Sequence, residues 1–281
     1  MAPIRPGNFK TGYYANLLRI RPAQLGELVK KCLRIKRLLV QSEKGYLFWV
    51  DPVSVFGLEM LRTGIYEPLM SRILELLLRE EDTFVDVGGN EGYFSVVASS
   101  LASRGKVHCI EPQTRLQAVI KENLRLNNFL HAQLHHLAFS SSEGKSFLYL
   151  RPTTNSGASS QLPHWKLGSQ HETIVTVTMD SFFRENSIDR VRLLKMDCEG
   201  AEGEIVKGAQ VTLQQHSIDF IALEYHPTIC GFDRCLEIDK QIKAYGYQLT
   251  KIQGHHIYHL PGNERMLESL GGMQVNCNWE T

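Results

Sequence analysis

Short apolar runs alternate with segments of helical periodicity along most of the chain after residue 64. Thr114–Leu126 repeats its apolar positions at helical spacing, with an apolar run on either side of it. This alternation of strand and helix predicts an α/β fold with a mainly parallel, doubly wound sheet. The runs that we expect to form strands are 84–87, 107–110, 133–139, 191–196, 220–223, 247–252 and 255–260.

The first part of the chain has a different pattern. We expect a helix over about 22–39, two strands within 38–50, and helical segments within 57–79. Residues 1–63 are therefore predicted to form an N-terminal helical and strand extension that packs on a core domain of residues 64–281. Tyr66 and Glu67 form either an ordinary helix start or part of a site wall.

An insertion at about 140–178 interrupts the strand–helix alternation. Two apolar runs in it, 147–150 and 174–177, are expected to be strands. Between them, residues 153–160 are small and polar, which is typical of a disordered tether or of a functional lid. His164 and Trp165 would either contact a substrate or anchor this loop.

Composition restricts the classes of protein. The 281 residues carry 31 basic and 30 acidic side chains, and this balance gives no support for a nucleic-acid partner. The six cysteines are scattered without a C-x-x-C pair, residues 1–10 lack an apolar signal core, and no apolar run is long enough to span a membrane. We expect a cytoplasmic protein. We expect the basic helix over 22–39 to have a solvated face and the protein to have no membrane partner; binding to a membrane surface or an acidic partner is the alternative.

The most specific segment is 83–93, which reads as strand, tight loop and helix. A dinucleotide fingerprint G-x-G-x-x-G fails here, because Asn90 and Tyr93 occupy its second and third glycine positions. The pattern D-x-G-x-N-x-G fits, with Asp86 before the loop and Gly88, Asn90 and Gly92 within it. A carboxylate there suits a cationic ligand, and S-adenosylmethionine carries both an ammonium and a sulfonium group. A tight turn without a ligand is the alternative.

Further candidates lie at the ends of the next two strands. Glu111, at the tip of the strand after Asp86, is expected to accept the ribose hydroxyls of a nucleoside or, alternatively, to cap the following helix. Ala138 would let an adenine ring lie against the backbone, although a plain packing role fits it equally well.

A second constellation follows the strand over 191–196. Asp197 ends that strand before a helix expected from Glu202 to Gln214, so it should lie at the same sheet edge as Asp86 and Glu111. Glu199 and Glu202 are interpreted as first-turn acids that favour the helix dipole, with a place among the carboxylates near a bound cation as the alternative.

The strand over 220–223 ends at Glu224 and His226. His226 is the leading general-base candidate if its pKa is the ordinary one near neutrality, and a structural histidine is the alternative. His255 and His259 share a strand face without a third ligand, so we expect no metal. The sequence contains no G-x-S-x-G nucleophile elbow, Walker phosphate-binding loop or H-E-x-x-H helix. Hydrolase, nucleotide triphosphatase and zinc-protease functions therefore lack support.

Four segments together resemble the FkbM family of S-adenosylmethionine-dependent methyltransferases. In this chain they are Phe-Val-Asp-Val-Gly-Gly-Asn-Glu-Gly-Tyr at 84–93, Ile-Glu-Pro at 110–112, Asn123 to Asn127, and Leu-Lys-Met-Asp-Cys-Glu-Gly-Ala-Glu at 194–202. The resemblance implies a class I methyltransferase sheet of about seven strands, the last antiparallel, and O-methylation of a sugar, polyketide or other natural product. Gly89 stands where the family commonly has alanine.

The resemblance also implies roles for residues. The loop from Asp86 to Tyr93 would hold the methionine part of S-adenosylmethionine. Glu111 with its neighbour Pro112 would hold the ribose, and Asp197 would lie near the reactive methyl group. A hydroxyl-bearing small molecule would be the substrate, attacking the methyl in line, with the segment over 153–160 excluding water.

Three candidates for accepting the hydroxyl proton are His226, Asp197 and Glu224. Two other classes of protein stay open at this point. One is a non-catalytic protein that binds S-adenosylmethionine, and the other is a nicotinamide oxidoreductase, which the loop spacing disfavours. The sequence does not determine the oligomeric state; a homodimer is one arrangement that fits it.

Overall fold

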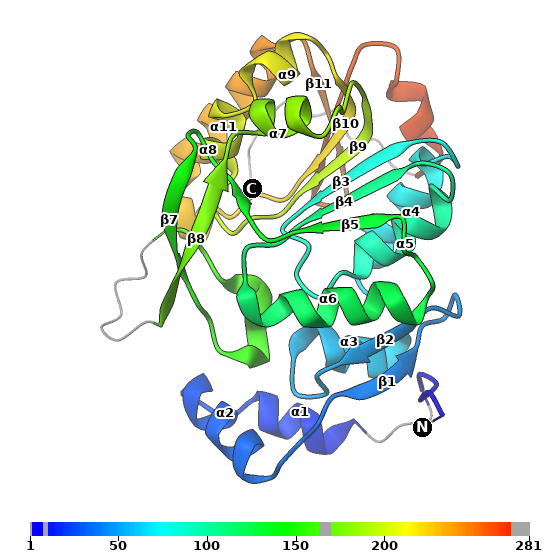
Figure 1. The fold of residues 1–281 in the computed structure, drawn as a ribbon, viewed down its shortest axis with the longest axis vertical. Coiled ribbons are helices and arrows are strands. Elements are labelled where there is room, and N and C mark those ends of the chain that lie inside the picture. The colour runs from blue at the N-terminus through cyan, green and yellow to red at the C-terminus, as the bar shows by residue number, and fades with distance from the viewer. Residues whose placement is uncertain (1, 8–10, 163–169, 271–281) are drawn as a thin grey trace.

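A seven-stranded mixed sheet forms the centre of the computed structural model, which describes residues 2–7, 11–162 and 170–270 (Figure 1). Five neighbouring strands are parallel, and β12 runs antiparallel to both of its neighbours. This confirms the predicted doubly wound sheet with an antiparallel last strand. Across the sheet the strands are β11 (Gln248–Ile252), β12 (His255–His259), β10 (Ile218–Leu223), β9 (Val191–Met196), β3 (Thr83–Val87), β4 (Lys106–Ile110) and β5 (Ala132–His135).

The strand order reverses between β3 and β9. From β3 the chain proceeds outward through β4 to β5, whereas from β9 it proceeds the other way to β10. In open α/β sheets, ligands bind outside the carboxyl ends of the strands at such a switch point. The loops after β3 and β9 therefore meet where a ligand is expected.

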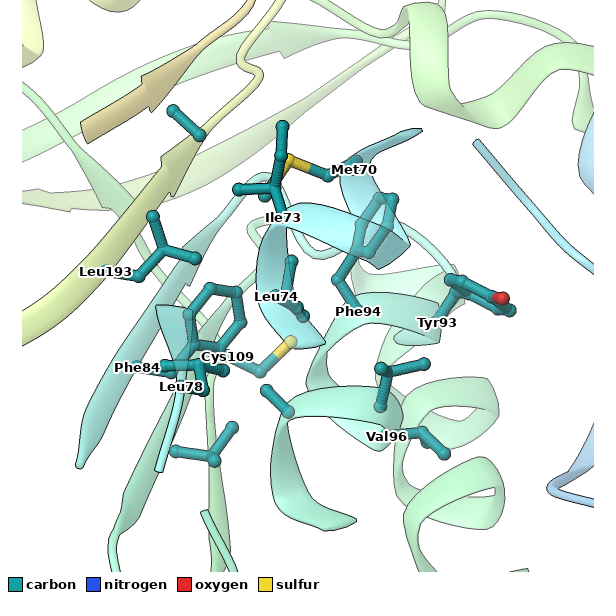
Figure 2. Close-up of a cluster of buried hydrophobic side chains, with 14 of the residues drawn as sticks. Met70, Ile73, Leu74, Leu78, Phe84, Tyr93, Phe94, Val96, Cys109 and Leu193 are labelled. Atoms are coloured by element: carbon teal, nitrogen blue, oxygen red, sulfur yellow. The ribbon is translucent and has the colours of Figure 1, made fainter. Parts of the chain in front are cut away.

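Helices cover both faces of the sheet because its strands are apolar on both sides. One face packs against α4 (Pro68–Leu77) and α5 (Tyr93–Leu101), and Figure 2 shows Ile73, Leu74 and Phe94 from these helices around Phe84 and Leu193 of the sheet. The helices that pack on the opposite face are α7 (Met179–Glu185), α8 (Glu202–Lys207), α9 (Gln210–Gln214) and α11 (Phe232–Ala244).

The described residues among the first 63 pack against this core, with Val40, Phe48 and Phe56 in the same apolar cluster as Phe84. They form α1 (Gly12–Leu18), α2 (Ala23–Cys32), the antiparallel strands β1 (Leu38–Gln41) and β2 (Leu47–Val50), and α3 (Val55–Thr63). Helix α6 (Thr114–Leu126) lies beside β2 (Figure 1).

Two asparagines join α6 to β2. The Asn123 Oδ1 atom accepts the amide of Trp49 at 2.7 Å, and Asn127 exchanges two 2.8 Å hydrogen bonds with the backbone of Leu47. The asparagines of the 123–127 motif thus satisfy backbone groups of β2 that have no sheet neighbour there.

The insertion forms a small sheet of β6 (Ala138–Phe139), β8 (His171–Val177) and β7 (Gly144–Tyr149). The expected strands of the insertion are confirmed and are longer than predicted. The single strand expected over 133–139 is wrong: β5 ends at His135, and Ala138 belongs to β6, which pairs with β8 in this second sheet. The chain leaves the main sheet there because Ala138 hydrogen-bonds a different partner strand.

Two predicted helices also need correction. The helix expected over 22–39 ends at Cys32, since residues 38–41 pair with β2 as a strand. The helix expected from Glu202 to Gln214 is divided into α8 and α9, because Gly208 lies against the backbone of Ser140 in close approach. Within the described residues, no helix is long and apolar enough to cross a membrane.

The remaining elements are short. The loop from β7 toward β8 contains the 3₁₀ segment η1 (Thr153–Ala158). A four-residue helix, α10 (Pro227–Cys230), follows β10, and η2 (Glu264–Leu270) packs on the face of the sheet that α4 covers. His164 and Trp165 lie outside the described residues.

Candidate functional site

A cavity lies over the carboxyl ends of β3, β4, β9 and β10, with about 1020 Å³ of atom-free space that includes its opening to solvent. Its walls come from the main sheet, the small sheet, η1 and the N-terminal section. The lining residues include Phe56, Tyr66, Glu67, Gly88, Asn90, Ile110, Glu111, Pro112, Gln113, Ala138, Phe139, Ser156, Asp197, Cys198, Glu199 and Glu224.

The loop after β3 turns sharply under the cavity. Gly88 has a φ of +82°, and a Cβ at this position would overlap the carbonyl oxygen of Asp197 on the neighbouring loop. Gly92, with a φ of +81°, precedes the first residue of α5. Glycine is required at position 88 for both conformation and space, so the loops after β3 and β9 are fitted to each other.

Gly89 and Asn90 complete this loop. A Cβ at Gly89 would overlap the sulfur of Cys109, and Asn90 adopts a left-handed φ of +48°. The departure from the family's common alanine at position 89 is thus matched by a cysteine on β4 that fills the adjacent space. Glycine is needed at position 89 because of the space that Cys109 occupies, and not because of backbone conformation.

Four of the predicted loop residues are not among those that line the cavity: Asp86, Gly89, Gly92 and Tyr93. Asp86 is fully buried behind the loop, where it accepts a 2.7 Å hydrogen bond from the Ser95 hydroxyl and lies 3.9 Å from Lys195 Nζ. Tyr93 packs in an aromatic cluster with Phe48 and lines a smaller adjoining cavity. The register of β3 explains the position of Asp86, because alternate side chains of a strand point to opposite faces.

Glu111 lies at the tip of β4 and faces the cavity. Its carboxylate accepts the backbone amides of Asn90 at 2.8 Å and of Gln113 at 2.9 Å. Burial raises the pKa of Glu111 to about 7, although both amides act in the opposite direction. The side chain therefore joins the loop after β3 to Gln113, the residue before α6, and lies beside the cavity.

The segment η1 covers one side of the cavity. The Ser156 hydroxyl donates to Asn90 Oδ1 at 3.1 Å, and the Gln113 side-chain amide donates to the Ser156 carbonyl at 3.2 Å. Pro112 and Ala138 form neighbouring parts of the wall. The predicted lid segment therefore lies directly against the glycine loop.

Charged side chains gather at the tips of β9 and β10. Asp197 lies 3.5 Å from Lys195 Nζ and 3.4 Å from His226 Nε2, so positive groups flank it on two sides. Lys195 is nearly fully buried between Asp86 and Asp197 and lies over the ring of Phe94. The carboxylates beside Lys195 raise its pKa even though burial lowers it.

His226 is held by the buried carboxylate of Glu202. Its Nδ1 atom lies 3.1 Å from Glu202 Oε1, which also accepts the backbone amides of Cys198 and Gly200. Although burial lowers the pKa of His226, the hydrogen bond and negative charge of Glu202 raise it to about 9. The ordinary pKa expected for this histidine is therefore wrong, and the side chain is protonated at neutral pH.

Three glutamates lie around Asp197. Burial raises the pKa of Glu67 and of Glu199 to about 7, and the charge of Asp197 adds to the increase in both. Burial and Asp197 also raise the pKa of Glu224. The cavity thus contains several carboxyl groups that disfavour one another's ionisation.

Some of these groups are close enough to hold a divalent cation. The ligand atoms of Asp197, Glu199 and His226 lie within 4.8 Å of one another, as do those of Glu67, Asp197 and Glu224. The second set offers only oxygen, which magnesium and calcium prefer. Neither set found among the described residues includes His255 or His259.

Several side chains of the site were not singled out from the sequence as site residues. Glu67 was left open between a helix start and a site wall, and the structure places it in the wall. Lys195 carries a signal that could have been used, since a lysine inside an apolar parallel strand requires an opposite charge nearby. Gln113 and Ser156 carry no such signal, because only the fold brings the insertion over the loop.

The residues present fit S-adenosylmethionine. Glu111 offers a carboxylate beside the cavity for hydroxyl groups, Ile110 and Phe139 provide apolar walls, and the carboxylates near Asp197 suit a cation. The strand order and this site define a class I S-adenosylmethionine-dependent methyltransferase. Residues 86–249 match the methyltransferase FkbM domain. The chain belongs to the FkbM methyltransferase family.

Relatives with curated functions are distant. The chain is 24% identical over 185 residues to 2-O-methyltransferase NoeI of Sinorhizobium fredii, covering 58% of this chain and 72% of the relative. It is 27% identical over 192 residues to hexuronic acid methyltransferase AglP of Haloferax volcanii, covering 68% and 76%. A crystal structure of methyltransferase FkbM from Methylobacillus flagellatus has a TM-score of 0.47 at 16% identity, with 65% of this chain and 44% of that chain covered.

Proposed function

We propose that this methyltransferase transfers the methyl group to a hydroxyl oxygen of a small molecule, with a sugar as the first candidate. The observation that carries the proposal is the juxtaposition of two regions in one cavity. Glu111 and the glycine loop lie on one side, and Asp197 and Glu224 lie at the neighbouring strand tips. A carboxylate near the acceptor can receive a hydroxyl proton as the oxygen is methylated.

The names of two relatives support the choice of acceptor. One is called a 2-O-methyltransferase and the other a hexuronic acid methyltransferase. Both are less than 30% identical to this chain, so they support a hydroxylated acceptor and leave its identity to be measured.

In this proposal the chain's own residues have separate tasks. When bound, S-adenosylmethionine supplies an electrophilic methyl group on a positively charged sulfur. Glu111 holds hydroxyl groups of the cofactor, and the glycine loop fixes the floor of the cavity. Asp197 accepts the hydroxyl proton at a carboxylate oxygen, with Glu224 beside it as the alternative acceptor.

His226 has a positioning task in this scheme. Glu202 keeps it protonated, and its Nε2 atom lies 3.4 Å from Asp197, so it cannot take a further proton but can orient the carboxylate. Anchored by Asn90 and Gln113, η1 excludes water from one side of the cavity.

The proposal also includes the cellular compartment in which the enzyme works. Within the described part of the chain, five cysteines are free thiols. Free thiols are stable where glutathione and thioredoxin keep the compartment reducing. We therefore place the enzyme in the cytoplasm, where S-adenosylmethionine would serve as its donor.

Two measurements test the function. First, the purified protein is titrated with S-adenosylhomocysteine and, separately, with NAD, and we expect binding and thermal stabilisation by the former alone. Second, methyl-labelled S-adenosylmethionine is incubated with a panel of neutral sugars, uronic acids and hydroxylated aglycones. Label in an ether linkage is the expected product, identified by its resistance to mild base that cleaves methyl esters.

Other products would overturn the acceptor assignment. Label found only in an ester or an amine would contradict O-methylation of a hydroxyl while leaving the methyltransferase class intact. Conversion of no acceptor by a protein that binds S-adenosylhomocysteine would favour the non-catalytic binding role.

A further inference from the structure

The charge of this protein is divided unevenly along the chain. Residues 1–40 contain nine lysines and arginines and one acidic residue, whereas residues 41–281 contain 22 basic and 29 acidic residues. The near-neutral total therefore conceals a strongly basic N-terminal section on an acidic remainder. Such asymmetry is typical of a chain that meets a polyanion or an anionic surface with one end.

The basic section lies at one end of the molecule. Figure 1 shows α1 and α2 at the lower end of the long axis, on the far side of α6 and β1 from the main sheet. On α2, Leu25, Leu28 and Cys32 have helical spacing and share one face. Leu25 is 46% exposed, Leu28 is 57% exposed, and Leu33 just after the helix is 49% exposed. More than two fifths of the surface of each of these leucines is therefore open to solvent.

Cations surround these exposed leucines. Arg21 precedes the helix, Lys31 lies on it, and Arg34 and Lys36 follow it, all with exposed side chains. Glu27 is the single acid among residues 1–40, and its carboxylate lies 3.6 Å from Lys31 Nζ. We call the set Arg21, Leu25, Leu28, Lys31, Leu33, Arg34 and Lys36 the basic apolar face.

Other cations of the same section point inward and have structural partners. Lys30 pairs with Asp51, and Arg37 pairs with Glu91 at 2.6 Å. The outward cations with printed partners have them within the basic section itself: Arg21 donates to the carbonyls of Leu18 and Ile20, and Lys31 pairs with Glu27. Two sets of basic residues thus alternate along one segment, one holding the extension on the core and the other facing solvent.

We propose that the basic apolar face docks this protein on an anionic lipid bilayer. Leucines that enter the interface bury apolar area, while lysines and arginines beside them attract anionic headgroups. A nucleic acid would use the cations but give the exposed leucines nothing to bury. A second copy of this chain would bring the same cations against one another in a two-fold interface.

The docking face adjoins the cover of the cavity. Lys30, on the inward side of α2, donates a 3.2 Å hydrogen bond to the Thr153 hydroxyl of η1, whose Ser156 binds Asn90 of the glycine loop. A bilayer that binds α2 would therefore lie next to the segment that covers the active site. The proposal itself requires only the basic apolar face and stands apart from the choice of methyl acceptor.

Co-sedimentation of the full chain with vesicles tests this proposal. We expect binding to vesicles of phosphatidylcholine mixed with phosphatidylglycerol, weakening as salt is added, and little binding to phosphatidylcholine alone. Replacing Lys31 and Arg34 by glutamine should weaken binding about fivefold for each cation removed. The pair Leu25→Ser and Leu28→Ser should weaken it by about tenfold or more, since two buried apolar side chains are lost.

Matched controls keep the test specific. Lys145→Gln and Val211→Ser change an exposed cation and an exposed apolar side chain on β7 and α9, away from α2 (Figure 1), and should leave vesicle binding unchanged. Thermal unfolding of each variant confirms that the fold persists. Failure of the wild type to bind anionic vesicles, equal binding by the face variants, or binding to single-stranded RNA in place of vesicles would each overturn the proposal.

Discussion

The two sides of the candidate-site cavity are constructed by different physical means. On the side of β3 and β4, the Glu111 carboxylate accepts backbone amides, and Gly88 and Gly89 fit against neighbouring atoms. On the side of β9 and β10, Asp197 lies among other ionisable groups, with Lys195 at 3.5 Å and His226 at 3.4 Å. One side is determined by shape and hydrogen bonds, the other by balanced charge.

Because of this difference, we expect the two sides to respond differently to substitutions and to pH. Close packing changes little with pH but tolerates no added atoms, although Glu111 on this side also has its pKa raised, to about 7. A cluster of charges keeps its packing when a side chain is replaced by one of the same shape. The ionisation of each group in the cluster nevertheless depends on the charges of all the others. We expect variants of the first side to alter folding and cofactor affinity, and variants of the second to alter turnover and pH dependence.

Gly88→Ala should have the largest effect, because Gly88 lies where the two sides meet. The added Cβ would overlap the Asp197 carbonyl, and a φ of +82° is unfavourable for alanine. We expect a loss of about 3 kcal/mol or more in the free energy of unfolding, measured by denaturant titration.

Gly254→Ala is the matched control for Gly88. Gly254 has a similar φ of +92°, but a Cβ there would meet no atom within 4 Å. It should cost about 1 kcal/mol from conformation alone. Equal losses in the two variants would contradict a close fit between the loops after β3 and β9.

Asp197→Asn should have the next largest effect and act on turnover. Asparagine keeps the size of the side chain but is a poor proton acceptor, so we expect kcat to fall on the order of a hundredfold. Binding of S-adenosylhomocysteine, measured by calorimetry, should change much less.

Glu111→Gln is the opposite case, on the other side of the cavity. It should weaken S-adenosylhomocysteine binding more than it lowers kcat, since one of two amide-accepting oxygens is lost. If Asp197→Asn mainly weakened S-adenosylhomocysteine binding and Glu111→Gln mainly lowered kcat, the proposed roles of the two sides of the cavity would be contradicted.

Gly89→Ala tests packing on the side of β3 and β4. The added methyl group would overlap the Cys109 sulfur, and we expect a destabilisation of about 2 kcal/mol. In a Cys109→Ala background the same substitution should cost close to nothing, because the sulfur has been removed. Additive costs in this double-mutant cycle, measured by chemical unfolding, would show that Cys109 does not determine the need for glycine.

Glu199→Gln should give the smallest effect, and one that depends on pH. The pKa of Glu199 is about 7 in the fold against an ordinary value of 4.5, so the wild type loses stability as pH rises through this window. Below it both proteins carry a neutral side chain and should unfold alike. Above it the variant should be more stable by about 1 kcal/mol, after allowance for solvent screening.

Thermal unfolding across this pH range checks the prediction for Glu199. Glu143→Gln is the control, since Glu143 is an exposed glutamate of the insertion, and it should leave the pH dependence of the melting temperature unchanged. A stabilisation of Glu199→Gln that is equal at low and high pH would show that ionisation is not its cause.

The sequence predicted the main elements well where their signal is local. Apolar runs and helical spacing identified β3, β4, β9, β10 and α6, and the glycine pattern located the loop after β3. The strand expected over 133–139 failed because pairing with β8, a contact across the insertion, separates Ala138 from β5. The periodicity of a segment depends on residues that are close in the sequence. It does not indicate which distant strand the segment will pair with.

The sequence by itself determined the fold class, the family and the acids at the strand tips, because these follow from residue type and local order. Only the tertiary structure decided what those side chains do. It placed Asp86 behind the loop beside Lys195, and it kept His226 protonated through Glu202. Burial and the distance between charges set a pKa and an orientation, and both depend on segments that the fold alone brings together.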